Sequence, residues 1–325
     1  MNTIQLLVLS ILVFSVGAIL SLLCNSSRTA RFVSGISGLL ASAIGFTSAI
    51  SSGQELSNTL SYNGIPPFGS FVLSMDHLSA FMVGVICLLG FAVNIYSISY
   101  LRDYETFNLR TMGFFSNLFI AGMILVVTTA NAFYFLIFWE VMTLTSYFLG
   151  IYNTKNNESI RAGYLYLFVA HTGTVLIMIS FLILFMHVGN FDFSAFRLTS
   201  YSLSTRNFIF LLAFFGFGAK AGIVPLHFWL PRAHPAAPSH ISALMSGIMI
   251  ETAIYGIIRV SIDFLGATEL WWAFVILVFG ALSAIFGAFF ALSEKDLKRL
   301  LAYSSVENVG LILLGVGLGI VGLSQ

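Results

Sequence analysis

The chain has 325 residues, of which 58% are hydrophobic and only 8% are charged, and its mean hydropathy is +0.96. A soluble domain carries about 25% charged residues, so this composition indicates an integral membrane protein. The 14 Lys and Arg residues nearly balance the 13 Asp and Glu residues, which argues against a nucleic-acid partner, because such a partner needs a basic face. Cys24 and Cys87 are too few for a disulfide framework or an iron–sulfur cluster, which usually takes four thiolates.

About ten apolar runs follow one another along the chain, and each crossing of a membrane takes roughly 20 mostly apolar residues. No Lys or Arg precedes the first run, so it is predicted to be a retained helix rather than a cleaved signal peptide. Two longer loops, 51–73 and 188–206, separate spans, and the chain shows no separate soluble domain. The predicted spans are 4–23, 32–50, 74–98, 112–130, 132–151, 162–187, 207–230, 239–262, 270–292 and 300–322.

Lys and Arg residues gather on one side of this topology, which predicts its orientation. The connections that follow odd-numbered spans carry most of them, whereas the opposite side carries only Arg197, Arg206 and Arg259. The basic side is therefore predicted to be cytoplasmic, with the N-terminus outside the cell membrane. Its basic residues are Arg28, Arg31, Arg102, Arg110, Lys155, Arg161, Arg232, Lys295, Lys298 and Arg299.

Three charged residues lie deep inside predicted spans, where a charge at the bilayer centre costs roughly 2.5–3.5 kcal/mol even on the most lenient scale. Glu140 lies in the fifth span, Lys220 in the seventh and Glu251 in the eighth. His240 lies eleven residues before Glu251, which is almost three helical turns, so a regular helix places the two on one face.

Two interpretations of these buried charges are open. A Glu and a Lys can form a structural ion pair that fixes the register of the helices, although such pairs add little stability. Alternatively, the residues form a relay: burial disfavours the charged form of an ionisable group, which brings proton uptake and release nearer to neutral pH. Three charges in three spans exceed what helix assembly needs, which favours the relay.

The seventh span is predicted to be broken near Lys220. Pro225 lies five residues after this lysine, and Pro231 follows. Proline removes a backbone hydrogen bond and kinks or breaks a helix, and a membrane tolerates the freed carbonyls only against protein or a water-filled cavity. A broken helix beside a buried lysine is typical of an ion path; a plain proline kink is the alternative.

Four further ionisable residues are secondary candidates. His227 and His234 lie near the predicted break and can pass protons, because histidine titrates near neutral pH. His171, in the sixth span, is either a packing residue or a further relay group, and Glu307 lies close to basic residues that favour an interfacial position. No phosphate loop, dinucleotide fingerprint or hydrolase motif is present. The chain is therefore predicted to hold no cofactor, no metal and no catalytic centre.

Three blocks of the sequence resemble the antiporter-like subunits of respiratory complex I, membrane-bound [NiFe] hydrogenases, formate hydrogenlyases and multi-subunit sodium/proton antiporters. The amino-acid sequence of the longest block most resembles the hydrogenase-type branch. The blocks are GAKAGIVPLHFWLPRAHPAAPSHISALMSGIMIETAIYGIIRV (218–260), FWEVMTLTSYFLGIYN (138–153) and DLKRLLAYSSVENVGLILLG (296–315).

The resemblance implies an all-α membrane fold with two inverted five-helix repeats, each with one broken helix. It assigns the proton path to a Glu in the fifth helix and a Lys in the broken seventh helix, which match Glu140 and Lys220. A further ionisable residue of the eighth helix is often Lys, whereas this chain has Glu251 there. The second broken helix of the family is expected beyond the tenth span, so the second repeat is expected to be incomplete. The expected regions are 1–111 with three N-terminal helices, 112–264 as the first repeat and 265–325 as the start of the second.

Together these features predict a proton-translocating subunit of a complex-I-like or membrane-bound hydrogenase redox complex, with other membrane subunits as partners. The chain itself then holds no redox centre, and electron transfer in its partners drives the proton. The predicted path comprises Glu140, Lys220, Glu251 and His240, with the helix break at Pro225. Two alternatives stay open: a subunit of a multi-subunit sodium/proton antiporter, and a non-conducting assembly subunit.

Overall fold

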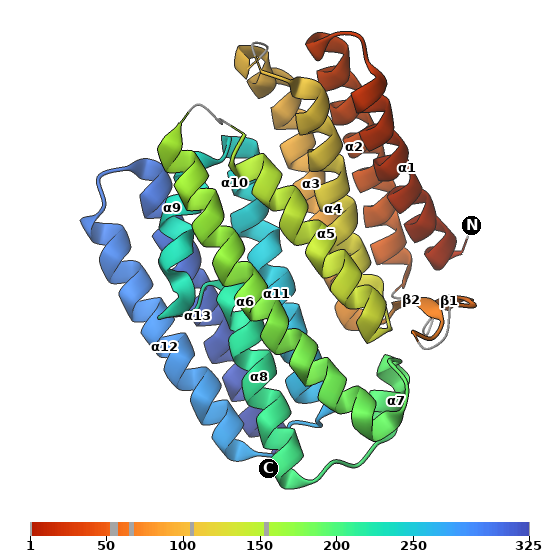
Figure 1. The fold of residues 1–325 in the computed structure, drawn as a ribbon, viewed down its shortest axis with the longest axis vertical. Helices are drawn as coiled ribbons and strands as arrows, with labels where there is room; N and C mark the ends of the chain where they lie inside the picture. Colours follow the sequence, from red (N-terminus) through yellow and green to blue (C-terminus); the bar gives the residue numbers. More distant parts are fainter. Residues whose placement is uncertain (1, 53–57, 65–67, 105–106, 153–155, 325) are drawn as a thin grey trace. The chain divides into compact units, whose positions relative to one another are not determined.

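The computed structural model describes the chain except residues 1, 53–57, 65–67, 105–106, 153–155 and 325. Ten helical segments of the described residues are long and apolar enough to cross a membrane, which confirms the all-α membrane fold and the predicted number of spans (Figure 1). These segments are Thr3–Leu23, Ser27–Ser51, His77–Tyr104, Leu109–Thr128, Ala132–Gly150, Asn157–Val188, Leu203–Ala236, Ser239–Phe264, Leu270–Ser293 and Leu297–Leu323.

The chain packs into two compact units. The first unit comprises Met1–Pro66, Ser70–Tyr152 and Pro238–Ile248, and the second comprises Pro67–Gly69, Asn153–Ala237 and Met249–Gln325. Packing groups the chain differently from a division by repeat, so the predicted repeat boundaries stay predictions.

The first unit is built on five long helices that approach closely through small residues. A methyl group added at Gly45 of α2 would overlap Ser10 of α1 and Cys87 of α3, and such small-residue contacts let backbones in lipid pack by van der Waals attraction. The helices of the unit are α1 (Thr3–Leu23), α2 (Ser27–Ser51), α3 (His77–Tyr100), α4 (Leu109–Thr128), α5 (Ala132–Gly150) and the short α10 (Ser239–Leu244), with a 3₁₀ turn at Leu101–Tyr104.

The stretch predicted as the long polar loop 51–73 contains one strand and the start of a second, and the sequence prediction missed both. β1 (Asn58–Tyr62) pairs with β2 (Phe71–Met75) in an antiparallel sheet, and Leu73 forms a further bridge with Thr129. The stretch contains several turn residues (Gly, Asn and Pro), which favoured a loop. A strand of five residues is too short to show a clear alternation of apolar and polar residues.

The second unit contains the remaining long helices, and two of them meet at glycines. A methyl group added at Gly310 of α13 would overlap backbone atoms of α12 at Ala284 and Gly280, so this approach requires a residue without a side chain. The helices of the unit are α6 (Asn157–Val188), α7 (Phe193–Leu198), α8 (Leu203–Ala221), α9 (Leu230–Ala236), α11 (Ile250–Ile258), α12 (Leu270–Ser293) and α13 (Leu297–Leu323). The predicted loop 188–206 therefore includes the short helix α7.

The seventh span is broken, as the sequence predicted, and the break begins before Pro225. Helix α8 ends at Ala221, and Gly222 caps it in the left-handed region (φ +74°), with its N–H donating to the carbonyl of Gly218 at 2.9 Å. The chain then turns through the 3₁₀ helix Leu226–Trp229 into α9. The glycine cap thus ends the helix, and the proline keeps the chain from continuing it.

The eighth span is not a regular α-helix. A π-helical segment, Met245–Met249, lies between α10 and α11, and a second one follows α11 at Arg259–Phe264. A π turn bonds each residue to the fifth residue along and so shifts the faces of the helix. The span therefore lacks the regular α-helical spacing from which His240 and Glu251 were expected to share one face, and that shared face stays a prediction.

Candidate functional site

Lys220 lies in the last turn of α8, directly before the break, and is only 1% exposed. Its Nζ donates a hydrogen bond to the Oη of Tyr166 on α6 at 2.8 Å, and lies 5.1 Å from the centre of that ring. The Tyr166 hydroxyl donates in turn to the Sδ of Met249 at 3.5 Å. The tyrosine stabilises the ammonium by a hydrogen bond and offers a cation–π contact in addition.

The break next to Lys220 leaves backbone groups without their helical partners, and side chains replace those partners. Trp229 donates from its indole Nε1 to the carbonyl of Ala219 at 2.9 Å, and the N–H of Val224 donates to the Oγ of Ser283 on α12 at 3.0 Å. The ring of Trp229 also lies 4.8 Å from that of Tyr166. The same aromatic pair therefore holds both the lysine and the broken backbone, as irregular backbone within a membrane requires.

The histidines predicted near the break lie in the second unit. His234 of α9 is buried, with 2% exposure, and its ring lies 6.3 Å from that of Trp229. His227 is partly buried and its ring lies 6.4 Å from that of Tyr303 on α13. Lys298 Nζ donates to the carbonyl of Ala237 at 2.9 Å, which ties the start of α13 to the end of α9.

Three other predicted residues of the second unit lie on its helices at differing depth. Glu251 is partly buried in the first turn of α11, a helix that packs against α8. Glu307 is partly buried on α13, where its backbone faces Gly287 of α12. His171 is exposed on α6, and its Nδ1 lies 3.0 Å from the carbonyl of Leu167 on the same helix.

Glu140 and His240 belong to the first unit. Glu140 is partly buried in the middle of α5. His240 is 2% exposed, and its ring lies 5.6 Å from that of Tyr100 on α3. The hydroxyl of Tyr100 accepts from the N–H of Ser239 at 3.3 Å and lies 2.8 Å from that of Tyr104.

A small cavity of about 10 Å³ lies beside His240. This volume is about the space that one water molecule takes. Its polar lining comes from Ser34 of α2, Asn94 and Ser97 of α3 and Ser116 of α4. The cavity can therefore hold a water that contacts His240. Sequence patterns did not reveal the residues that line it, because they come from three helices far from His240 in the chain.

The predicted residues thus divide between the two units, and the structure brings Lys220 and Trp229, with His234, around the break. Tyr166, Trp229 and Tyr100 were missed from the sequence. The signal available for them was slight, since an aromatic residue in an apolar span is common and its partner lies far away in the chain.

Comparison with known proteins decides the family. The family model described as the transmembrane part of NADH:quinone oxidoreductase and the Mrp antiporter matches residues 129–325. The chain belongs to this family. The model for the N-terminus of chain 5 of NADH-ubiquinone oxidoreductase, complex I, matches residues 69–109, so the predicted resemblance is confirmed.

Curated relatives support the hydrogenase-type branch of this family. Along its full length the chain is 49% identical to hydrogenase-4 component B of Escherichia coli strain K12 and 30% identical to formate hydrogenlyase subunit 3 of the same strain. It covers 49% and 51% of those proteins. Over 78% of its length it is 31% identical to NADH-quinone oxidoreductase subunit M of Escherichia coli and covers 52% of that protein. The chain thus spans about half the length of the curated relatives it matches.

Solved structures agree on the fold. A chain of the archaeal membrane-bound sulfane sulfur reductase matches with a TM-score of 0.82 and 22% identity, over 97% of this chain and 64% of that chain. A chain of the Mrp complex from Dietzia sp. matches with a TM-score of 0.84 and 24% identity, over 96% of this chain and 34% of that chain. At these identities the likeness supports the shared fold alone.

Proposed function

We propose that this chain is a proton-translocating membrane subunit of a redox complex of the hydrogenase type, or part of such a subunit. The observation that carries the proposal is Lys220, which is 1% exposed, ends α8 at the break and bonds to Tyr166 at 2.8 Å. A phenol hydroxyl accepts from an ammonium and can donate to a neutral amine. Both protonation states of the lysine therefore keep a hydrogen-bond partner, which suits a residue that gains and loses a proton.

The other residues of the predicted path take supporting roles in this proposal. Glu140 responds to the charge of a neighbouring subunit, Lys220 changes its protonation, and Glu251 with His240 passes the proton onward. His227 and His234, which lie after the break, and the more distant His171 and Glu307 are secondary candidates. The buried position of His240 beside a cavity of about 10 Å³ supports its place in the path, because a single water there can carry a proton to it.

Assembly and location are part of the same proposal. The partners are other membrane subunits, as the names hydrogenase-4 component B and formate hydrogenlyase subunit 3 suggest for the relatives. The chain lies in the cell membrane in this proposal, and the distribution of Lys and Arg supports an orientation with the N-terminus outside. Residues 112–264 form the first repeat of the proposed conducting fold.

The test is Lys220→Ala in the complete subunit within its assembled complex, reconstituted in proteoliposomes. Proton uptake driven by the electron donor should be lost, whereas Lys295→Ala, which removes an exposed lysine between α12 and α13, should leave it unchanged. Full pumping by an intact complex with Lys220→Ala would refute the proposal. Sodium-dependent proton exchange without an electron donor would instead identify an antiporter.

A further inference from the structure

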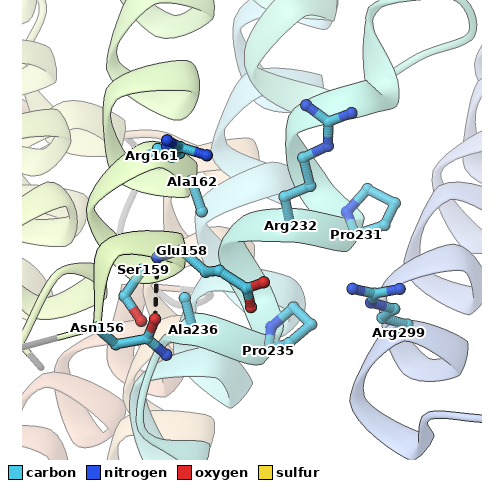
Figure 2. A pocket seen from close by; sticks show the side chains of 10 residues that line it. All are labelled: Asn156, Glu158, Ser159, Arg161, Ala162, Pro231, Arg232, Pro235, Ala236 and Arg299. Carbon is cyan, nitrogen blue, oxygen red and sulfur yellow. Dashed lines mark hydrogen bonds between the residues drawn. The ribbon is translucent and has the colours of Figure 1, made fainter.

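A cavity of about 470 Å³ opens in the second unit between α6, α9 and the start of α13 (Figure 2). Arg161 of α6, Arg232 of α9 and Arg299 of α13 line it, so three positive charges come together from three different helices. The proposed proton path uses none of these three residues. The cavity therefore needs an explanation of its own.

The three arginines carry charge that the described part of the chain does not neutralise. Their guanidinium groups form no hydrogen bond or ion pair with any residue that the structure describes. Glu158 is the one carboxylate among the described lining residues, which leaves the lining with a net charge of +2. By contrast, Arg197 and Arg259 both pair with Asp263, at 2.6 and 2.9 Å. Unpaired arginines around a hollow favour an anionic ligand.

The position of the cavity along the spans indicates the kind of anion. Arg161 lies in the second turn of α6, Arg299 in the first turn of α13, and Arg232 close to the end of the seventh span. All three lie on the side predicted to be cytoplasmic. Basic pockets at this depth meet the headgroups of anionic lipids, and the planar guanidinium fork matches the oxygens of a phosphate.

A neighbouring cavity of about 370 Å³ shares Arg232 and Arg299 with the first. Phe228, which is 43% exposed, and Tyr303 add aromatic surface there, and Glu294 adds a carboxylate. A free phosphate would gain nothing from the aromatic surface. An amphiphile gains from both parts, because its phosphate meets the arginines while its glycerol and first methylene groups lie against the aromatic rings.

The two cavities share lining residues, and together they are called the arginine cavity. We propose that the arginine cavity binds an anionic phospholipid by its phosphate headgroup. Arg161, Arg232 and Arg299 hold the phosphate, and Phe228 contacts the start of the acyl chains. His227, a secondary candidate of the proton path, also lines the smaller cavity. The three arginines have no part in that path, so lipid binding through them and proton transfer through Lys220 can each fail without the other.

The test compares two double variants of the complete subunit in its assembled, delipidated complex. One is Arg232→Gln with Arg299→Gln, and the control is Arg28→Gln with Arg102→Gln, which removes two exposed charges from the first unit on the same predicted side. Native mass spectrometry follows the binding of dioleoyl phosphatidylglycerol, with dioleoyl phosphatidylcholine as a lipid of the same tails. A surface arginine contributes roughly fivefold to anionic lipid binding, so the loss of two should weaken phosphatidylglycerol binding by the test variant about 25-fold relative to the control.

Each outcome decides the proposal. A selective loss of phosphatidylglycerol in the test variant, with unchanged phosphatidylcholine, supports it. Equal phosphatidylglycerol binding by both variants would overturn it, as would displacement of the bound lipid by millimolar inorganic phosphate, which would identify a free-anion site. If a partner subunit dissociates from the test variant but not from the control, and lipid binding is unchanged, the arginines form a protein contact and the proposal is overturned.

Discussion

Replacing Gly222 by Ala should destabilise the protein through the helix break. Gly222 has φ +74°, and for an alanine this left-handed conformation costs about 1–2 kcal/mol. The new methyl group would also overlap the Cδ1 of Leu230, and overpacking of this kind costs about 1–3 kcal/mol. The free energy of unfolding should therefore fall by about 2–5 kcal/mol, with both terms added.

Unfolding of the purified protein in mixed micelles measures this effect, and Gly315→Ala is the matched control. Gly315 lies inside α13, and a methyl group added there meets no atom within 4 Å, so this change should stabilise the helix by about 0.5–1 kcal/mol. Opposite signs for the two glycines are the expected result. Equal effects at both positions would refute the claim that the break depends on a glycine conformation.

A double-mutant cycle separates the two contributions. Leu230 is fully buried, so Leu230→Ala alone should cost about 2–5 kcal/mol. It also removes the atom that the new methyl group would meet, so the combined variant should cost about 1–3 kcal/mol less than the sum of the single variants. A cycle without coupling would mean that the whole loss comes from the backbone conformation and that the steric part of the reasoning is wrong.

Three further outcomes follow from named contacts. Tyr166→Phe keeps the ring but removes the oxygen that Lys220 contacts at 2.8 Å. A hydrogen bond from a charged donor contributes about 1.5–3 kcal/mol, so donor-driven pumping in proteoliposomes should fall at least tenfold. An unchanged rate would mean that Tyr166 has no part in the path. Trp229→Phe leaves the carbonyl of Ala219 without its indole donor, and the free energy of unfolding should fall by about 1–3 kcal/mol; no change would show that another group satisfies it. Asp263→Asn weakens two ion pairs and should lower thermal stability more at low than at high salt; a loss independent of salt would contradict this.

The sequence was a good guide wherever lipid sets the constraint. The ten spans follow from the need for roughly 20 apolar residues per crossing, and Lys220 beside Pro225 marked the broken helix. Both features are local in the chain, and a residue's own neighbours are enough to show them.

Features that depend on tertiary contacts could not be predicted in the same way. Tyr166 lies 54 residues before Lys220, and nothing in its own span distinguishes it from other aromatic residues. The π turn at Met245–Met249 contains no proline, and its Ser246 and Gly247 are common in membrane helices, so a regular helix was expected there. The arginine cavity was also missed, because Arg161, Arg232 and Arg299 read individually as ordinary charges at the ends of spans.

The proton-to-electron ratio of the assembled complex tests the central claim most directly. The ratio is measured in proteoliposomes from the pH change per electron delivered, for the complex with Lys220→Ala and for the complex with Lys295→Ala. If Lys220 carries the proton, the ratio should fall only in the Lys220→Ala complex. An unchanged ratio in a fully assembled Lys220→Ala complex would contradict the account.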